Sequence, residues 1–149
     1  MLTTFTQIVE RINSYRGMPE GWDGYTAKAP NADKLNAALR FLCHGLMLEL
    51  QEPLLQRFPP CWAVPTTDGG VQFSWNSDID SPGDFRVLEL QVLADDDFDF
   101  YADGHTLGGH GMRSNRTNLR GAIALVRWLC TGEAASDLPP DFDDAERER

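Results

Sequence analysis

The spacing of large apolar residues predicts three amphipathic helices, over residues 4–16, 32–50 and 115–130. In each range the apolar side chains recur at intervals of three and four, which gathers them on one face of a helix. The three faces consist of Phe5, Ile8, Val9, Ile12 and Tyr15; of Leu35, Ala38, Leu39, Leu42, Leu46 and Leu50; and of Leu119, Ala122, Ile123, Val126, Leu129 and Cys130. Because an apolar helix face must be covered, we expect all three helices to pack on a common core.

Between the second and third helices the apolar period shortens to two residues, which predicts β-strands. The segment Cys61–Pro65 has prolines at both ends, as is typical of an edge strand. Apolar and polar side chains also alternate over residues 71–75, 85–93 and 98–101. Consecutive strands that are joined by short turns pair antiparallel, so this region predicts a meander of three or four strands.

The predicted fold class is therefore α+β, with two N-terminal helices, a three- to four-stranded antiparallel meander and a C-terminal helix packed on the sheet. A chain of 149 residues has the length of one ordinary domain. We assign residues 1–132 to this domain. Residues 133–149 are expected to form an acidic, flexible tail, because they offer few apolar side chains to bury.

The net charge of −10 narrows the classes of partner. The chain has 13 Lys and Arg against 23 Asp and Glu, whereas nucleic-acid binding needs basic side chains that displace counterions from phosphates. The same imbalance disfavours an anionic membrane surface and favours encounter with a basic protein. We therefore expect a basic protein partner and no direct binding of nucleic acid or membranes.

The start of the chain lacks the basic and apolar regions of a signal peptide, and no apolar run approaches the ~18 residues of a membrane span. Three cysteines, Cys43, Cys61 and Cys130, do not form the even set that a disulfide framework needs. These observations predict a cytoplasmic protein.

Two segments of opposite charge are candidate partner-binding sites. Residues 78–112 hold nine acids and one base, and residues 113–130 hold four arginines and no acid. The acidic candidates are Asp95, Asp96, Asp97 and Asp99, and the basic candidates are Arg113, Arg116 and Arg120. With Arg127, these arginines would form a stripe along the predicted third helix. The stripe could bind phosphates or an acidic partner, or it could be a solvated face paired with acidic turns or the tail.

Local signatures of catalysis or metal binding are weak. The glycine-rich loop 103–113 contains His105 and His110, which could hold a metal with Cys61 or an aspartate. The acids from 95 to 99 alternate as in a calcium loop, but Phe100 replaces the glycine which that loop requires. A nucleophile elbow, an HExxH motif and a CxxC motif are all missing from the sequence. We therefore predict no catalytic residue, no metal and no cofactor.

Two further segments carry a resemblance. Residues 21–30, GWDGYTAKAP, precede a predicted helix, and residues 65–75, PTTDGGVQFSW, form a predicted turn and strand. They resemble an uncharacterised family of small bacterial proteins with a WDGYGA-like loop and a PTxDGGVxxxW hairpin. The resemblance covers about residues 5–100, and Thr26 stands where the family usually has glycine. It implies no activity, cofactor or catalytic residue.

The residues of this structural motif are Trp22, Asp23, Gly24, Tyr25, Asp68, Gly69, Gly70 and Trp75. Trp22 and Tyr25 are expected to pack across the sheet near Trp75, with Asp23 capping the loop backbone. Gly69 and Gly70 are expected to supply the positive φ angles of a hairpin turn. An aromatic ligand pocket is the alternative interpretation.

Together these patterns predict a small, acidic, non-catalytic protein that binds a more basic protein, and whose binding could inhibit that partner. An antitoxin, an immunity protein or a phage-type inhibitor has this character. The alternatives are a small metal-dependent enzyme that uses His105 and His110, and a phosphate-binding module that uses the arginine stripe.

Overall fold

The computed structural model describes residues 2–47, 50, 61–76, 86–104 and 111–132. Helix α1 (Leu2–Ser14) ends in a 3-10 turn, and helix α2 (Ala32–Arg40) continues into the π-helical segment Phe41–Leu46. The five strands are β1 (Cys61–Pro65), β2 (Val71–Asn76), β3 (Arg86–Ala94), β4 (Asp97–Gly104) and β5 (Gly111–Thr117), and helix α5 (Leu119–Thr131) follows them.

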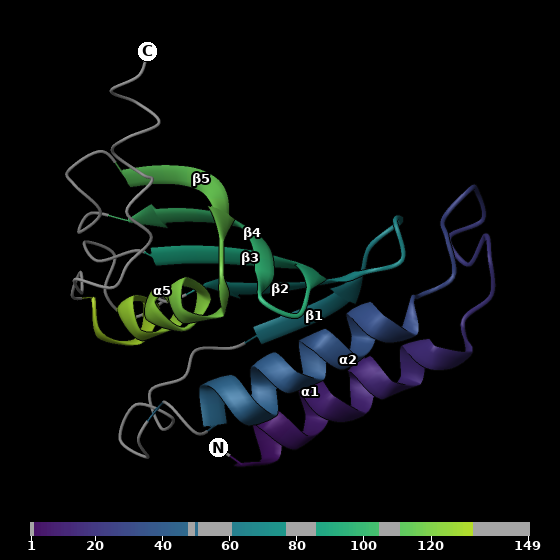
Figure 1. Cartoon of the computed structure of the whole chain (residues 1–149), viewed down its shortest axis with the longest axis horizontal. Coiled ribbons are helices and arrows are strands. Elements are labelled where there is room, and N and C mark those ends of the chain that lie inside the picture. The colour runs from purple at the N-terminus through teal and green to yellow at the C-terminus, as the bar shows by residue number, and fades with distance from the viewer. Residues whose placement is uncertain (1, 48–49, 51–60, 77–85, 105–110, 133–149) are drawn as a thin grey trace.

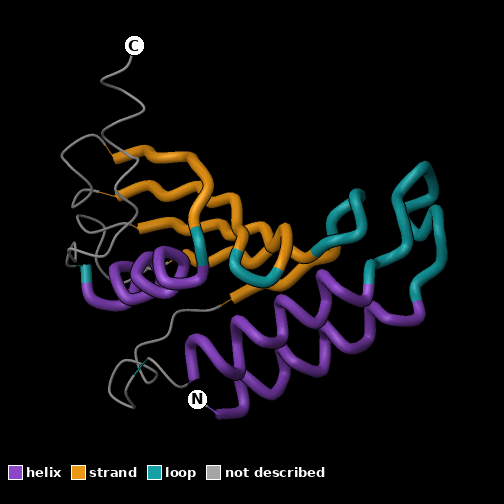
Figure 2. The backbone as a smooth tube through the Cα atoms, in the orientation of Figure 1, coloured by secondary structure: helices purple, strands orange, loops and turns teal. Residues whose placement is uncertain are grey.

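The five strands form one antiparallel sheet in the order β1-β2-β3-β4-β5, and the helices pack on one face of it (Figures 1 and 2). Helix α1 contacts β1, α2 contacts β2 and β3, and α5 contacts β3 and β4. The predicted α+β class, the two N-terminal helices and the C-terminal helix are confirmed. Strand β1 lies at an edge of the sheet, as its flanking prolines indicate.

The prediction of three or four strands, with a last helix that begins at residue 115, is wrong. Residues 111–117 form the fifth strand, and α5 begins only at Leu119. The strand has the sequence GMRSNRT, so no apolar alternation marks it. The helix begins where it does because Asn118 Oδ1 accepts a hydrogen bond, 2.9 Å long, from the backbone N–H of Gly121.

The core lies between the helices and the inner face of the sheet. Alternate residues of β2, β3 and β4 are buried there, namely Val71, Phe73 and Trp75; Leu88, Leu90 and Val92; and Phe98, Phe100 and Ala102. Phe41 of the π-helical segment packs on Phe73 and Phe98, with ring centroids 5.5 and 5.2 Å apart. The alternation that predicted the strands is therefore the pattern of burial on this face.

Gly104, at the end of β4, lets α5 approach the sheet closely. A Cβ atom at this position would lie 2.7 Å from Cζ2 of Trp128 and 3.1 Å from Cγ of Arg86. Trp128 is fully buried, and the Nε of Arg86 donates a 3.0 Å hydrogen bond to the backbone oxygen of Leu129. Neither neighbour can move aside without loss of packing, so only glycine fits here.

We predict that Gly104→Ala destabilises the fold by about 1–3 kcal/mol, because it overpacks the contact with Trp128. Urea unfolding of the purified chain measures this change. Gly45→Ala is the control, because its Cβ would make an ordinary 3.4 Å contact with Ile123 and Ala is a better helix former than Gly. Equal stability of the two variants would contradict the proposed close approach.

Candidate functional site

The predicted arginine stripe does not exist as a helix face. Arg113 and Arg116 belong to β5, whereas Arg120 lies exposed in the first turn of α5. A strand and a helix that meet at Asn118 cannot present these residues on one helical side. The phosphate-binding module that depended on the stripe loses its geometric basis.

The acidic turn between β3 and β4 contacts three other elements. Asp95 forms an ion pair with Arg40 of α2, and Asp97 forms one with Arg116 of β5. The Oδ1 of Asp96 accepts a 2.7 Å hydrogen bond from the backbone N–H of Leu119. The three aspartates therefore tie α2, β5 and the start of α5 to one hairpin.

Two further observations show that the carboxylates of this turn make contacts within the domain. Asp96 has a φ of 119°, a strained value for a residue other than glycine, and its carboxylate caps the positive end of α5. The hydrogen bond and charge of Asp97 raise the pKa of Arg116, and the charge of Asp99 contributes. Asp99 is paired in register with Arg116.

We predict that Asp96→Ala lowers the free energy of unfolding by about 1–2 kcal/mol, because α5 loses a cap and alanine disfavours the positive φ. Thermal and urea unfolding measure this loss. Asp96→Asn retains an acceptor oxygen and tolerates the backbone conformation, so it is expected to stay close to wild type. An unchanged Asp96→Ala variant would show that the contact does not stabilise the domain.

The outer face of the sheet is a second acidic region, and the described helices leave it uncovered. Strand alternation places Glu89, Asp97, Asp99 and Asp103 on this face with Arg116. Among the described residues of this face, four carboxylates thus stand with one guanidinium. No described residue forms an ion pair with Glu89 or Asp103.

Apolar side chains lie on the same face, at the β1 edge. Trp62 is 52% exposed and Val64 is 41% exposed. Trp62 of β1 pairs with Ser74 of β2, which pairs with Glu89 of β3, which in turn pairs with Tyr101 of β4. These four residues therefore form one row across the outer face. The face therefore combines exposed apolar surface at one edge with carboxylates across its centre, a composition that suits a protein interface.

Sequence reasoning named only part of this face. Asp97 and Asp99 were candidate residues, whereas Trp62, Glu89 and Tyr101 were not. The two-residue period that predicted the strands also places Trp62 and Val64 opposite the buried Ala63. The two-residue period was visible in the sequence, but only the pairing of the strands shows which residues of different strands share a face.

The two segments that carry the family resemblance lie against each other at one end of the sheet. The backbone N–H of Lys28 donates to the oxygen of Thr67 at 2.9 Å, and that of Asn31 donates to the oxygen of Gly69 at 2.7 Å. Asp23 caps the loop as predicted, because its Oδ1 accepts from the backbone N–H groups of Tyr25 and Ala27. The loop and the turn form one hydrogen-bonded unit.

The expected cluster of Trp22, Tyr25 and Trp75 is wrong. Trp75 is buried near the other end of β2, where it stacks on Phe73 with a centroid distance of 5.6 Å. The Nε1 of Trp22 donates a 2.9 Å hydrogen bond to the oxygen of Lys28 within its own loop. Tyr25 is 84% exposed. The side chains do not converge, so they form no aromatic pocket.

The glycines of this unit have different roles. Gly24 and Gly69 have positive φ angles of 85° and 91°, which confirms the turn geometry that was expected of Gly69. The same expectation for Gly70 is wrong. Gly70 instead lies close to its neighbours, because a Cβ there would lie 3.1 Å from Thr66 Oγ1 and 3.3 Å from the oxygen of Val92.

Asp68 holds the β1–β2 turn through several contacts. Thr66 Oγ1 donates to its carboxylate, Gln91 Nε2 donates to Oδ2 at 3.1 Å, and Lys34 Nζ lies 4.0 Å away. The hydrogen bond from Thr66 is the main cause of its lowered pKa, with further contributions from Lys34 and the N–H of Gly70. The charged form of Asp68 is thus favoured in the folded state.

We predict that Asp68 contributes stability that is present above pH ~4 and is lost as the pH falls through its lowered pKa. The contribution is at most ~1 kcal/mol, because half of the side chain is exposed. Unfolding of wild type and Asp68→Asn at pH 6 and pH 3 measures it. The stability gap between them should narrow at pH 3, and a gap that does not change with pH would contradict the assignment.

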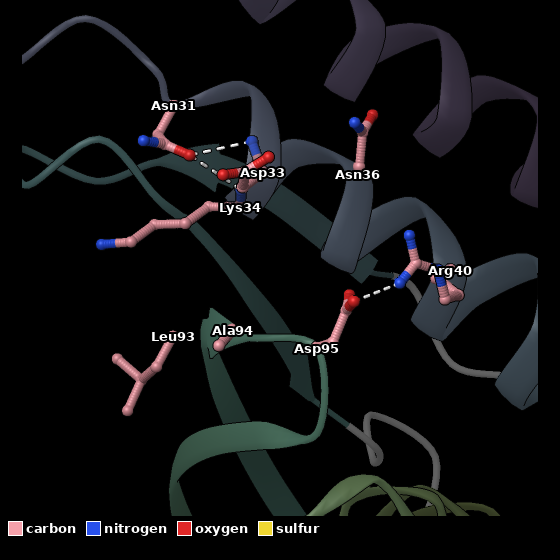
Figure 3. A pocket seen from close by; sticks show the side chains of 8 residues that line it. All are labelled: Asn31, Asp33, Lys34, Asn36, Arg40, Leu93, Ala94 and Asp95. Carbon is pink, nitrogen blue, oxygen red and sulfur yellow. Dashed lines mark hydrogen bonds and ion pairs between the residues drawn. The ribbon is translucent and has the colours of Figure 1, made fainter.

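A polar groove of about 550 Å³ lies between α2 and the end of β3 (Figure 3). Its lining consists of Asn31, Asp33, Lys34, Asn36, Arg40, Leu93, Ala94 and Asp95. The ion pair between Arg40 and Asp95 crosses it, whereas Lys34 and Asn36 point away from this pair (Figure 3). Asn36 accepts a 2.6 Å hydrogen bond from Arg16. The polar groups do not converge on one point, so we assign the groove no ligand.

The metal-enzyme alternative is not decided by these residues. His105, His110 and the tail 133–149 lie outside the described residues. Within the described ranges no group of three or more His, Cys, Asp and Glu could hold a metal. Burial strongly raises the pKa of the Cys61 thiol, which makes it a poor nucleophile. Among the same residues, no helix is long and apolar enough to cross a membrane.

Comparison with known proteins adds no functional assignment. No protein-family model, curated protein or solved structure matches this chain.

Proposed function

We propose that this chain is a non-catalytic binding protein whose partner is a basic protein, and that the partner binds the outer face of the sheet. The observation that carries the proposal is the composition of this face, which the described helices leave uncovered. Among the described residues, Glu89, Asp97, Asp99 and Asp103 stand there with one arginine, Arg116, and the exposed Trp62 lies on the same face at the β1 edge.

The charge of the face favours a basic occupant. A second copy of the chain would place carboxylates against carboxylates, which disfavours self-association through this face. Glu89 and Asp103 form no ion pair with a described residue, so their charges can serve an incoming partner. Complementary charge mainly speeds encounter and fixes orientation.

Apolar contact is needed for affinity, and the edge of the face supplies it. Trp62 is the type of side chain that most often dominates the energy of an interface. Val64 extends the apolar surface along β1, and Tyr101 lies on β4 in register with Glu89. An antitoxin, an immunity protein or a phage-type inhibitor acts by covering a surface that its partner needs. A protein that covers a basic surface in this way would inhibit its partner.

The acidic turn Asp95–Asp97 is a weaker candidate for the binding surface. Each of its three aspartates already has an intramolecular contact, and a partner would have to compete with these contacts. Asp99 remains in the proposal as a residue of the outer face. Asp97 contributes to both, because it lies on this face and pairs with Arg116.

We predict that Glu89→Gln with Asp103→Asn weakens binding of the partner at least tenfold at 150 mM salt, since about two ion pairs are lost. Trp62→Ala is expected to weaken it by a similar factor. The partner is first captured on the immobilised wild-type chain from cells that produce it. The purified partner is then titrated against each variant.

The matched control is Glu10→Gln with Glu20→Gln, which removes the same charge from exposed positions on α1 and the loop after it. This variant should bind within about twofold of wild type. If it weakens binding as much as the outer-face variant does, the effect is one of net charge. Localisation to the sheet would then be contradicted.

A further inference from the structure

The loop of residues 18–30 is more constrained than a connection between two helices requires. The backbone N–H of Gly24 donates to the oxygen of Gly21 at 2.9 Å, and that of Gly21 donates to the oxygen of Ala27 at 2.7 Å. Asp23 and Trp22 add three side-chain hydrogen bonds within the loop. Contacts with Thr67 and Gly69 then fix its base to the β1–β2 turn.

Tyr25 belongs to this constrained loop, and 84% of its surface is exposed. An aromatic ring is stabilised by burial, so a loop that served only as a connection would gain by folding the ring onto the domain. Here the hydrogen bonds hold the backbone while the ring stays in solvent. The ring of Tyr25 is therefore not part of the buried surface that stabilises the fold.

We propose that Tyr25 is an anchor for a protein partner, and that its ring enters an apolar pocket on that partner. A rigid loop loses little conformational entropy on binding, and tyrosine offers a large contact area with only two side-chain torsions. The hydroxyl adds a polar contact at the base of such a pocket. The inference extends the proposed function, since the partner is again a protein, but it uses a surface other than the sheet.

The surroundings of Tyr25 favour a protein over a nucleic acid. An exposed aromatic ring can stack on a base, but such sites also need basic side chains that follow the phosphates. The loop of residues 18–30 contains two acids, Glu20 and Asp23, and one base, Lys28. With a chain charge of −10, a polyphosphate backbone would be repelled.

The test begins with a photo-reactive benzoylphenylalanine at position 25 of the full chain, made in the cells that produce it. The control carries the same group at position 10, which is exposed on α1. A protein cross-linked from position 25 and not from position 10 is purified and titrated against variants. We expect Tyr25→Ala to lower its affinity at least tenfold, and Tyr25→Phe to lower it less.

Thr26→Ala and Lys28→Ala are matched controls, because both side chains are exposed on the same loop, and they should bind within twofold of wild type. Absence of a cross-link specific to position 25, or a Tyr25→Ala variant that binds within twofold, would overturn the inference. The variant Glu89→Gln with Asp103→Asn, titrated against the same protein, reports the sheet face separately. The experiment therefore distinguishes failure of the proposed role of Tyr25 from failure of the proposed role of the outer face.

Discussion

One-sided burial of the sheet is the constraint on which the rest of the structure depends. All the described helices pack on the inner face, where Phe73, Leu90 and Phe100 stand on adjacent strands. Because side chains alternate along each strand, burial of this face also fixes which side chains reach the outer face. The acidic composition of that face follows from the same register that builds the core.

The acidic residues of the β3–β4 turn and those of the outer face consequently have different roles. Those of the β3–β4 turn are held by Arg40, Arg116 and the start of α5, and they stabilise the arrangement of helices around the sheet. Glu89 and Asp103 lie in mid-sheet without such contacts among the described residues. Net charge alone cannot separate these groups, because each carboxylate contributes one unit to the total of −10 whatever its contacts.

Much of the fold could be predicted from periodicity, since burial imposes it directly. The stripe from Phe5 to Ile12 and the alternation from Leu88 to Val92 identified elements that the structure contains. Strand β5 could not be predicted this way, because its sequence is polar and pairing with β4 determines its conformation. That error also produced the arginine stripe.

The candidate surfaces were less predictable, because they depend on contacts between segments distant in sequence. Nothing local indicates that Asp96 caps a helix that begins at Leu119. For Tyr25, the expectation that aromatic loop residues fold onto the domain failed, because the hydrogen bonds of Trp22 and Asp23 fix the loop backbone with the ring exposed.

Carboxylate footprinting of the complex tests most directly whether the outer face of the sheet is the binding surface. The chain is labelled with a carbodiimide and a small amine, free and with its partner bound, and the modified residues are quantified by mass spectrometry. We expect labelling of Glu89 and Asp103 to fall in the complex, while labelling of Glu10 and Glu20 stays unchanged. Protection of Glu10 and Glu20, with Glu89 and Asp103 labelled as in the free chain, would contradict the account.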